Sequence, residues 1–101
     1  MNTTTKRSRA TKGADKIADA IRAQLLQRGC RNEDISLDWF PDLHRLSSVE
    51  APELRAAVAD SGNVLQMFSR EELEVSGEQL ERESVLAKIN LVVESLQAGL
   101  P

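Results

Sequence analysis

The stretch from Ser76 to Gly99 constrains the fold more than any other part of the chain. Ser76 followed by Gln79 matches the capping-box pattern, in which each side chain satisfies a free backbone N–H of the first helical turn. Gly99 stands where a left-handed residue commonly ends a helix. The sequence therefore predicts one long helix here. Its core-facing stripe covers an arc of about 120° and consists of Val85, Leu86, Ile89, Val92, Val93, Leu96 and Leu100.

The length and composition of the chain fit one domain with a modest core. It has 101 residues, of which 41% are hydrophobic and 29% are charged, as is usual for globular proteins. Only Trp39, Phe40 and Phe68 are aromatic, so the core must consist mainly of aliphatic side chains. The abundance of Ala, Leu, Glu, Arg and Gln favours helices.

The first thirteen residues differ in character from the rest. They contain no acid, and beyond Met1 they have no large apolar side chain. Such a segment buries too little surface to offset the entropy lost on ordering, so residues 1–13 are predicted to form a flexible basic arm. Its four bases are candidate contacts for nucleic acid phosphates. They are Lys6, Arg7, Arg9 and Lys12.

A second amphipathic helix is predicted from Ala14 to Arg28. Asp15 in its first turn and Arg28 in its last turn each match the sign of the helix dipole. Gly29 provides a stop signal. The apolar residues that recur every four positions are Ile17, Ile21 and Leu25.

Two shorter helices are predicted further along the chain. Pro52 suits the first turn of a helix that runs to about Asp60. Ser69 followed by Glu72 forms another capping box, which predicts a helix through Val75.

The segment from Asn32 to Ser48 supports two interpretations. Apolar and polar side chains alternate from Ile35 to Trp39, as in a short strand. Asp38 also suits the cap of a helix that runs through Leu46. We prefer the short helix because no other segment supplies convincing partner strands, and the strand remains the alternative.

Together these elements predict an all-α protein. Residues 14–101 form a single helical domain in this interpretation, and residues 1–13 form the disordered basic arm. The domain is a small bundle of about five helices, four of them short. The sequence shows no internal repeat and no second domain.

Side chains suited to catalysis do not cluster in the sequence. Cys30 is the only cysteine and His44 is the only histidine. Neither a metal site of several His and Cys ligands nor a freely assembled Cys–His pair is therefore predicted. Glycine-rich nucleotide-binding motifs are also absent. We expect a protein that is not an enzyme and that uses no metal and no cofactor.

The sequence also indicates the cellular compartment in which the protein is expected. No apolar run approaches the ~18 residues that span a membrane, and no signal-peptide core follows Met1. A single cysteine leaves a reducing compartment as the default. We expect a cytoplasmic protein without membrane contact.

Charge is segregated along the chain. Of its thirteen bases and sixteen acids, four bases lie in the arm, which leaves nine bases against sixteen acids. Between positions 71 and 83 a dense acidic strip could dock on a basic groove, and a solvated helix face is the competing interpretation. The candidate partner-binding residues are Glu71, Glu72, Glu74, Glu78, Leu80, Glu81 and Glu83. Trp39, Phe40 and Pro41 form the alternative candidate site.

The last predicted helix has a second row of small and apolar residues opposite its stripe. Such a row allows another helix to approach closely, so this helix is either central in its domain or shared with a second copy. The candidates for self-association are Leu80, Ala87, Leu91 and Ala98.

These features favour a small helical protein that binds another protein or protein complex stoichiometrically, as an adaptor, inhibitor or regulator. In size, acidic body and lack of a catalytic cluster, it resembles the small accessory proteins of bacteria and their phages. The alternative is a dimeric DNA-associated transcriptional regulator that uses the basic arm. A salt titration with DNA separates the two, because phosphate contacts give a steep salt dependence.

Overall fold

The computed structural model describes residues 9–42, 45–46, 51–59 and 63–98 and has an α+β fold. The predicted all-α bundle of about five helices is therefore wrong, because three segments pair as strands. In chain order the elements are α1 (Arg9–Gln27), η1 (Asn32–Asp34), β1 (Ile35–Phe40), β2 (Glu53–Val58), β3 (Asn63–Met67), α2 (Arg70–Glu78) and α3 (Glu83–Ala98).

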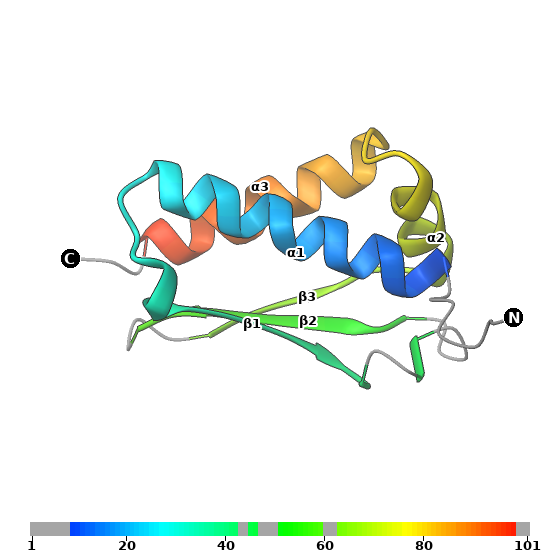
Figure 1. The fold of residues 1–101 in the computed structure, drawn as a ribbon, viewed down its shortest axis with the longest axis horizontal. Coiled ribbons are helices and arrows are strands. Elements are labelled where there is room, and N and C mark those ends of the chain that lie inside the picture. Colours follow the sequence, from blue (N-terminus) through cyan, green and yellow to red (C-terminus); the bar gives the residue numbers. More distant parts are fainter. Residues whose placement is uncertain (1–8, 43–44, 47–50, 60–62, 99–101) are drawn as a thin grey trace, which may run out of the picture.

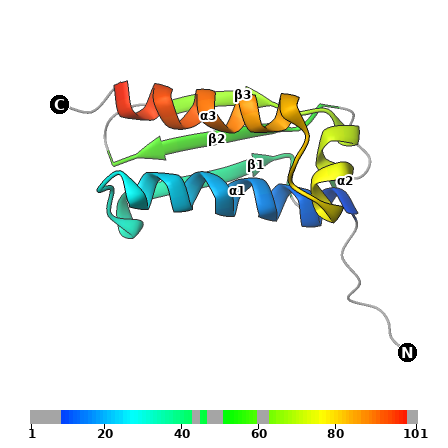
Figure 2. The same cartoon turned by 90° about the horizontal axis from the view of Figure 1, so that it is seen from above.

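The protein is built in two layers, with helices on one face of an antiparallel sheet. The strand order is β1-β2-β3. Figure 1 shows α1 and α3 side by side over the sheet, with α2 at one end. Seen from above in Figure 2, α1 runs over β1 and α3 runs over β3. Within the described part of the chain no helix or strand covers the opposite side, which we call the open face.

Alternation along the strands decides which side chains enter the core. Trp39 pairs with Leu54, and Ile35 pairs with Val58; all four are buried beneath the helices. The residues that alternate with the core-facing ones, such as Asp38 and Arg55, point to the open face, as the period of two requires. The sheet therefore has one core face and one face toward solvent.

Two predicted helices overlap strands instead. The preferred helix at 38–46 is wrong, and the alternative strand at 35–39 lies within β1. The predicted helix at 52–60 is also wrong, because β2 occupies most of it. The apolar residues at 56–58 are consecutive, so they fit a helical period as well as a strand period. Pairing with β1 and β3 on both sides decides between the two.

The predicted second helix is present as α1, but it begins earlier than expected. α1 starts at Arg9, and both Ala10 and Gly13 are buried. The predicted arm of residues 1–13 is therefore wrong for 9–13, which belong to the folded body. Residues 1–8 lie outside the described part.

α1 ends where the stop signal at Gly29 predicts. Gly29 has a φ of 96°, in the left-handed region that favours glycine. Its N–H donates to the Leu26 carbonyl (3.1 Å), and the Cys30 N–H donates to the Leu25 carbonyl (3.0 Å). This pair of bonds is a Schellman motif, which satisfies carbonyls that the helix end leaves free.

One of the two predicted capping boxes is confirmed. The Glu72 N–H donates to Ser69 Oγ (3.0 Å), and the Ser69 N–H donates to Glu72 Oε1 (2.8 Å). The box predicted at Ser76 is wrong, because Ser76 lies inside α2 and is completely buried. The long helix predicted from Ser76 is therefore two helices, and α3 begins only at Glu83.

The apolar stripe of α3 largely faces the core as predicted. Leu86 is the exception and is 40% exposed. Gly99 and Leu100 lie outside the described residues. The buried members of the stripe are Val85, Ile89, Val92, Val93 and Leu96.

α1 and α2 cross at very close range. A Cβ atom added to Gly13 would lie 1.6 Å from the Leu73 carbonyl oxygen, and one added to Gly77 would lie 2.5 Å from the Arg9 carbonyl oxygen. Glycine at both positions therefore lets the two backbones touch. This contact fixes α2 at the end of the sheet.

Candidate functional site

The open face of the sheet carries large apolar side chains. The register places Phe40, Glu53 and Met67 in one row across the three strands, and Asp38, Arg55 and Leu65 in the next. Phe40 is 44% exposed, Leu65 55% and Met67 53%. We call Phe40, Arg55, Leu65 and Met67 the open-face patch.

Charged groups lie within this patch and beside it. The Arg55 guanidinium carbon lies 4.1 Å from the centroid of the Phe40 ring, a cation–π geometry worth ~0.5–1 kcal/mol at an exposed site. Arg55 Nε also lies 3.8 Å from Glu53 Oε1. Asp38 Oδ2 accepts a hydrogen bond from Ser36 Oγ (3.2 Å). An apolar centre with a polar rim is the usual anatomy of a protein interface.

The sheet divides the predicted alternative site of Trp39, Phe40 and Pro41. Trp39 faces the core, where its ring centroid lies 5.6 Å from that of Phe68. Pro41 is half-buried, and only Phe40 is exposed on the open face. The three residues therefore do not form one surface.

The sequence reasoning missed Arg55, Leu65 and Met67. Leu65 and Met67 alternate with Val64 and Gln66, but Val64 is itself apolar, so this short run shows no clear alternation of apolar and polar residues. No local signal therefore identified residues 63–67 as a strand with two different faces.

The acidic strip is divided between a structural site and an exposed surface. Glu72 is 7% exposed, and its carboxylate accepts hydrogen bonds from Lys88 Nζ (2.7 Å) and Ser84 Oγ (2.8 Å). Glu71 lies 3.4 Å from Arg82. The other members are Glu74, Glu78, Glu81 and Glu83, which are half-buried or exposed.

The hydrogen bonds around Glu72 control its protonation. Burial raises the pKa of this carboxyl, but the hydrogen bonds from Lys88, from the Ser69 N–H and from Ser84 outweigh burial and hold it below the ordinary value of 4.5. A carboxyl with a lowered pKa in the folded state stabilises the protein above the unfolded-state pKa. That contribution is lost as the pH falls through the folded-state pKa.

We expect Glu72→Gln to lower the free energy of unfolding at neutral pH by about 1.5–3 kcal/mol, the usual value of hydrogen bonds to a charged group. The variant should also lose less stability than wild type as the pH is lowered below 4.5, because the titrating carboxylate is gone. Urea unfolding at several pH values measures both effects. Glu71→Gln is the matched control and should be nearly neutral. If the free energy of unfolding changed with pH in the same way for wild type and Glu72→Gln, this prediction would be contradicted.

Leu80 and the predicted self-association row occupy different environments. Leu80 is half-buried and packs against the core. Ala87, Leu91 and Ala98 are all exposed on α3. Leu80 precedes α3, which begins at Glu83, so it is not part of the row on that helix.

The basic residues of the predicted arm are only partly described. Lys6 and Arg7 lie outside the described residues. Arg9 pairs with Glu78 across the α1–α2 contact, and Lys12 is exposed on α1. Of the four candidate nucleic acid contacts, Arg9 is therefore engaged in an ion pair within the protein.

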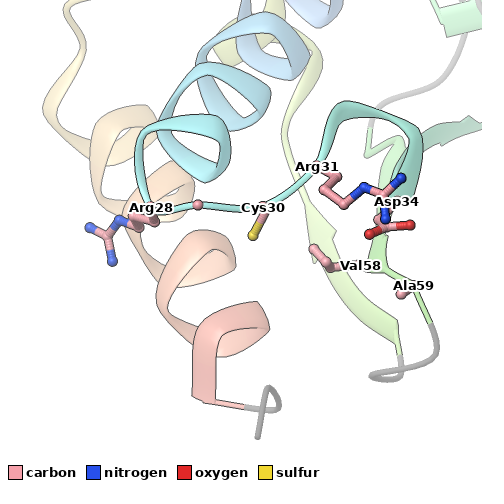
Figure 3. A pocket seen from close by; sticks show the side chains of 7 residues that line it. Arg28, Cys30, Arg31, Asp34, Val58 and Ala59 are labelled. Carbon is pink, nitrogen blue, oxygen red and sulfur yellow. The ribbon is translucent and has the colours of Figure 1, made fainter.

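A hollow of about 250 Å³ lies where α1 ends (Figure 3). Cys30 is half-exposed there. Arg28 donates to Gln97, and Arg31 pairs with Glu33, so both guanidinium groups are engaged. His44 lies outside the described residues. The lining residues are Arg28, Gly29, Cys30, Arg31, Asp34, Val58 and Ala59.

The described residues contain no group of three or more His, Cys, Asp and Glu side chains that could hold a metal ion. Among the described helices, none is both long and apolar enough to cross a membrane. Comparison of the chain with family models, curated proteins and solved structures finds no match.

Proposed function

We propose that this protein binds another protein stoichiometrically, without catalysis, and that the open-face patch is its docking surface. The observation that carries the proposal is the exposure of Phe40, Leu65 and Met67 beside Arg55 on one uncovered sheet face. Antiparallel sheets that face water usually present polar side chains there. Several large apolar groups on such a face are typical of a contact surface.

The size of the open face favours one helix of the partner. Three strands spaced by about 4.8 Å, each five or six residues long, make a face of about 14 × 20 Å. An α-helix with its side chains is about 10–12 Å wide. The patch therefore accommodates a single amphipathic helix with its apolar side against the sheet.

Charge favours a partner helix with basic residues beside its apolar side. Asp38 and Glu53 border the patch. The glutamates of the acidic strip other than the buried Glu72 would attract the same basic partner and accelerate its approach. We propose Glu71, Glu74, Glu78, Glu81 and Glu83 for this steering role.

Phe40→Ala should weaken binding of the captured partner at least about tenfold, as expected for loss of a central aromatic contact. The experiment captures the partner with the wild-type chain and measures affinity by titration calorimetry. Leu86→Ala, which removes another exposed apolar side chain from α3, is the control and should bind like wild type. Equal affinity of the two variants would overturn the patch as the docking surface.

Association rates measured with the same captured partner at two salt concentrations test the steering role. Reversing the charges of Glu74, Glu78 and Glu81 together should slow association and flatten its dependence on salt. An unchanged rate and an unchanged salt dependence would leave these residues as a solvated surface.

We propose further that the protein acts as an adaptor, inhibitor or regulator in the cytoplasm. The proposal includes the likeness to bacterial and phage accessory proteins. The alternative remains a dimeric DNA-associated regulator that uses the basic arm. Binding to duplex DNA with a steep salt dependence would favour that alternative.

A further inference from the structure

Lys88 connects three elements beside the open-face patch. Its Nζ donates to the Met67 carbonyl (3.0 Å) at the end of β3 and to Glu72 Oε1 (2.7 Å) on α2. The same nitrogen lies 5.3 Å from the centroid of the Phe68 ring. Because α3 runs over β3 (Figure 2), the lysine side chain reaches the sheet from the helix layer. Lys88 is not a member of the patch, but it binds the main chain of one of its members.

The peptide group between Met67 and Phe68 is held from both sides. Its N–H, which belongs to Phe68, donates to the Pro52 carbonyl (3.0 Å). Its C=O, which belongs to Met67, points the opposite way and accepts from Lys88. Residues paired in this way usually exchange two hydrogen bonds, but Pro52 has no N–H to return. The contact from Lys88 therefore supplies the second bond that holds this peptide group at the end of β3.

The orientation of this peptide group keeps the Met67 side chain on the open face. Phe68 is completely buried, whereas Met67 is 53% exposed, because successive side chains of an extended segment leave on opposite sides. Met67 completes the row that contains Phe40 and Glu53. A rotation at the end of β3 would therefore move one apolar member of the patch away from the others.

The same lysine connects the patch to the acidic strip. Glu72 belongs to that strip and is 7% exposed. Its Oε1 accepts from Lys88 Nζ and from the Ser69 N–H (2.8 Å), and its Oε2 accepts from Ser84 Oγ (2.8 Å). Ser69 follows Met67 by two residues, so the connection from β3 to α2 is bonded to Lys88 directly at one end and through Glu72 at the other. These bonds fix α2, and with it the other glutamates of the strip, relative to the patch.

We infer that Lys88 is a positioning residue of the docking surface, which holds Met67 in the open-face patch and keeps the acidic strip in place beside it. The inference rests on the proposed function, because it assigns Lys88 a role in binding the same partner. Lys88 acts through the Met67 carbonyl and not by contact with the partner, since two of the three donors of its ammonium group are used within the protein.

Hydrogen exchange of the free protein tests the effect on the main chain. Lys88→Met removes the donor and keeps a long side chain. The Val64 N–H also faces β2, since alternate residues of a strand direct their groups to the same side, so it reports on the rest of β3. In Lys88→Met the ratio of the Phe68 to the Val64 exchange rate should rise at least about tenfold.

Glu72→Gln is the matched control for hydrogen exchange. It lowers stability but leaves the bond from Lys88 to the Met67 carbonyl, so the ratio should stay as in wild type. An unchanged ratio in Lys88→Met would overturn the inference, because a loss of stability alone accelerates exchange at both amides together.

A double-mutant cycle tests the effect on docking. Lys88→Met should weaken binding of the captured partner at least about threefold. In a Met67→Ala background the same change should lose most of its effect, because the side chain to be positioned is gone. In a Phe40→Ala background it should keep its full effect. A full effect in both backgrounds would overturn the inference.

The binding results separate this inference from the proposed function. If Phe40→Ala binds like wild type, the open-face patch is not the docking surface and both proposals fail. If Phe40→Ala binds weakly while Lys88→Met binds like wild type, the docking surface stands and only the positioning role of Lys88 is overturned.

Discussion

Gly13→Ala is expected to destabilise the protein by about 3 kcal/mol or more, at the upper end of the usual cost of overpacking. The added methyl group would occupy a position 1.6 Å from the Leu73 carbonyl oxygen. That oxygen belongs to the backbone of α2, so relief requires the two helices to separate. Urea unfolding monitored by circular dichroism measures the loss.

Gly29→Ala is the matched control for this prediction. A Cβ atom at Gly29 meets nothing within 4 Å, so its cost is limited to the strain of a left-handed backbone, about 1–2 kcal/mol. The close contact at Gly13 would be contradicted if the two alanine variants had the same unfolding midpoint.

Phe68→Ala is expected to destabilise the protein by about 3–5 kcal/mol, the usual range for a fully buried phenylalanine. Phe68 is 0% exposed and follows β3 directly, where it contacts Trp39 across the core. Lys88 Nζ also lies 5.3 Å from its ring centroid. Its removal leaves a cavity between the sheet and α3, and chemical unfolding measures the cost.

Phe40→Ala makes the same change on the other face of the sheet. It should cost about 1 kcal/mol or less, because it removes little buried surface and one exposed cation–π contact. Similar losses for the two phenylalanine variants would show that the open face is buried in solution. Since Phe40→Ala is also the test of partner binding, its near-normal stability would allow a binding defect to be attributed to the patch.

The sequence alone determined the features that depend on local interactions. The spacing of apolar residues identified α1 and the core side of α3. Gly29 marked the end of α1, and Ser69 with Glu72 marked the start of α2. These signals lie within one or two helical turns, so they act regardless of what the rest of the chain does.

Tertiary structure decided which apolar runs became strands. Residues 53–58 and 63–67 carry patterns too short to distinguish a helix from a strand, and the choice depends on hydrogen bonds between segments distant in sequence. Ser76 had the pattern of a helix start, but the close crossing of α1 and α2 at Gly13 and Gly77 places it inside a helix. Packing outweighed the local signal there.

The candidate surface was decided almost entirely by register. Phe40, Arg55 and Met67 are separated by more than ten residues in sequence, and only strand pairing brings them together. Glu72 was recognised as an acid but not as the partner of Lys88, because that contact spans two helices. Composition could identify an acidic body with some exposed apolar groups. Only the sheet shows which apolar groups lie on the same face, because the period of two sends neighbouring residues to opposite faces.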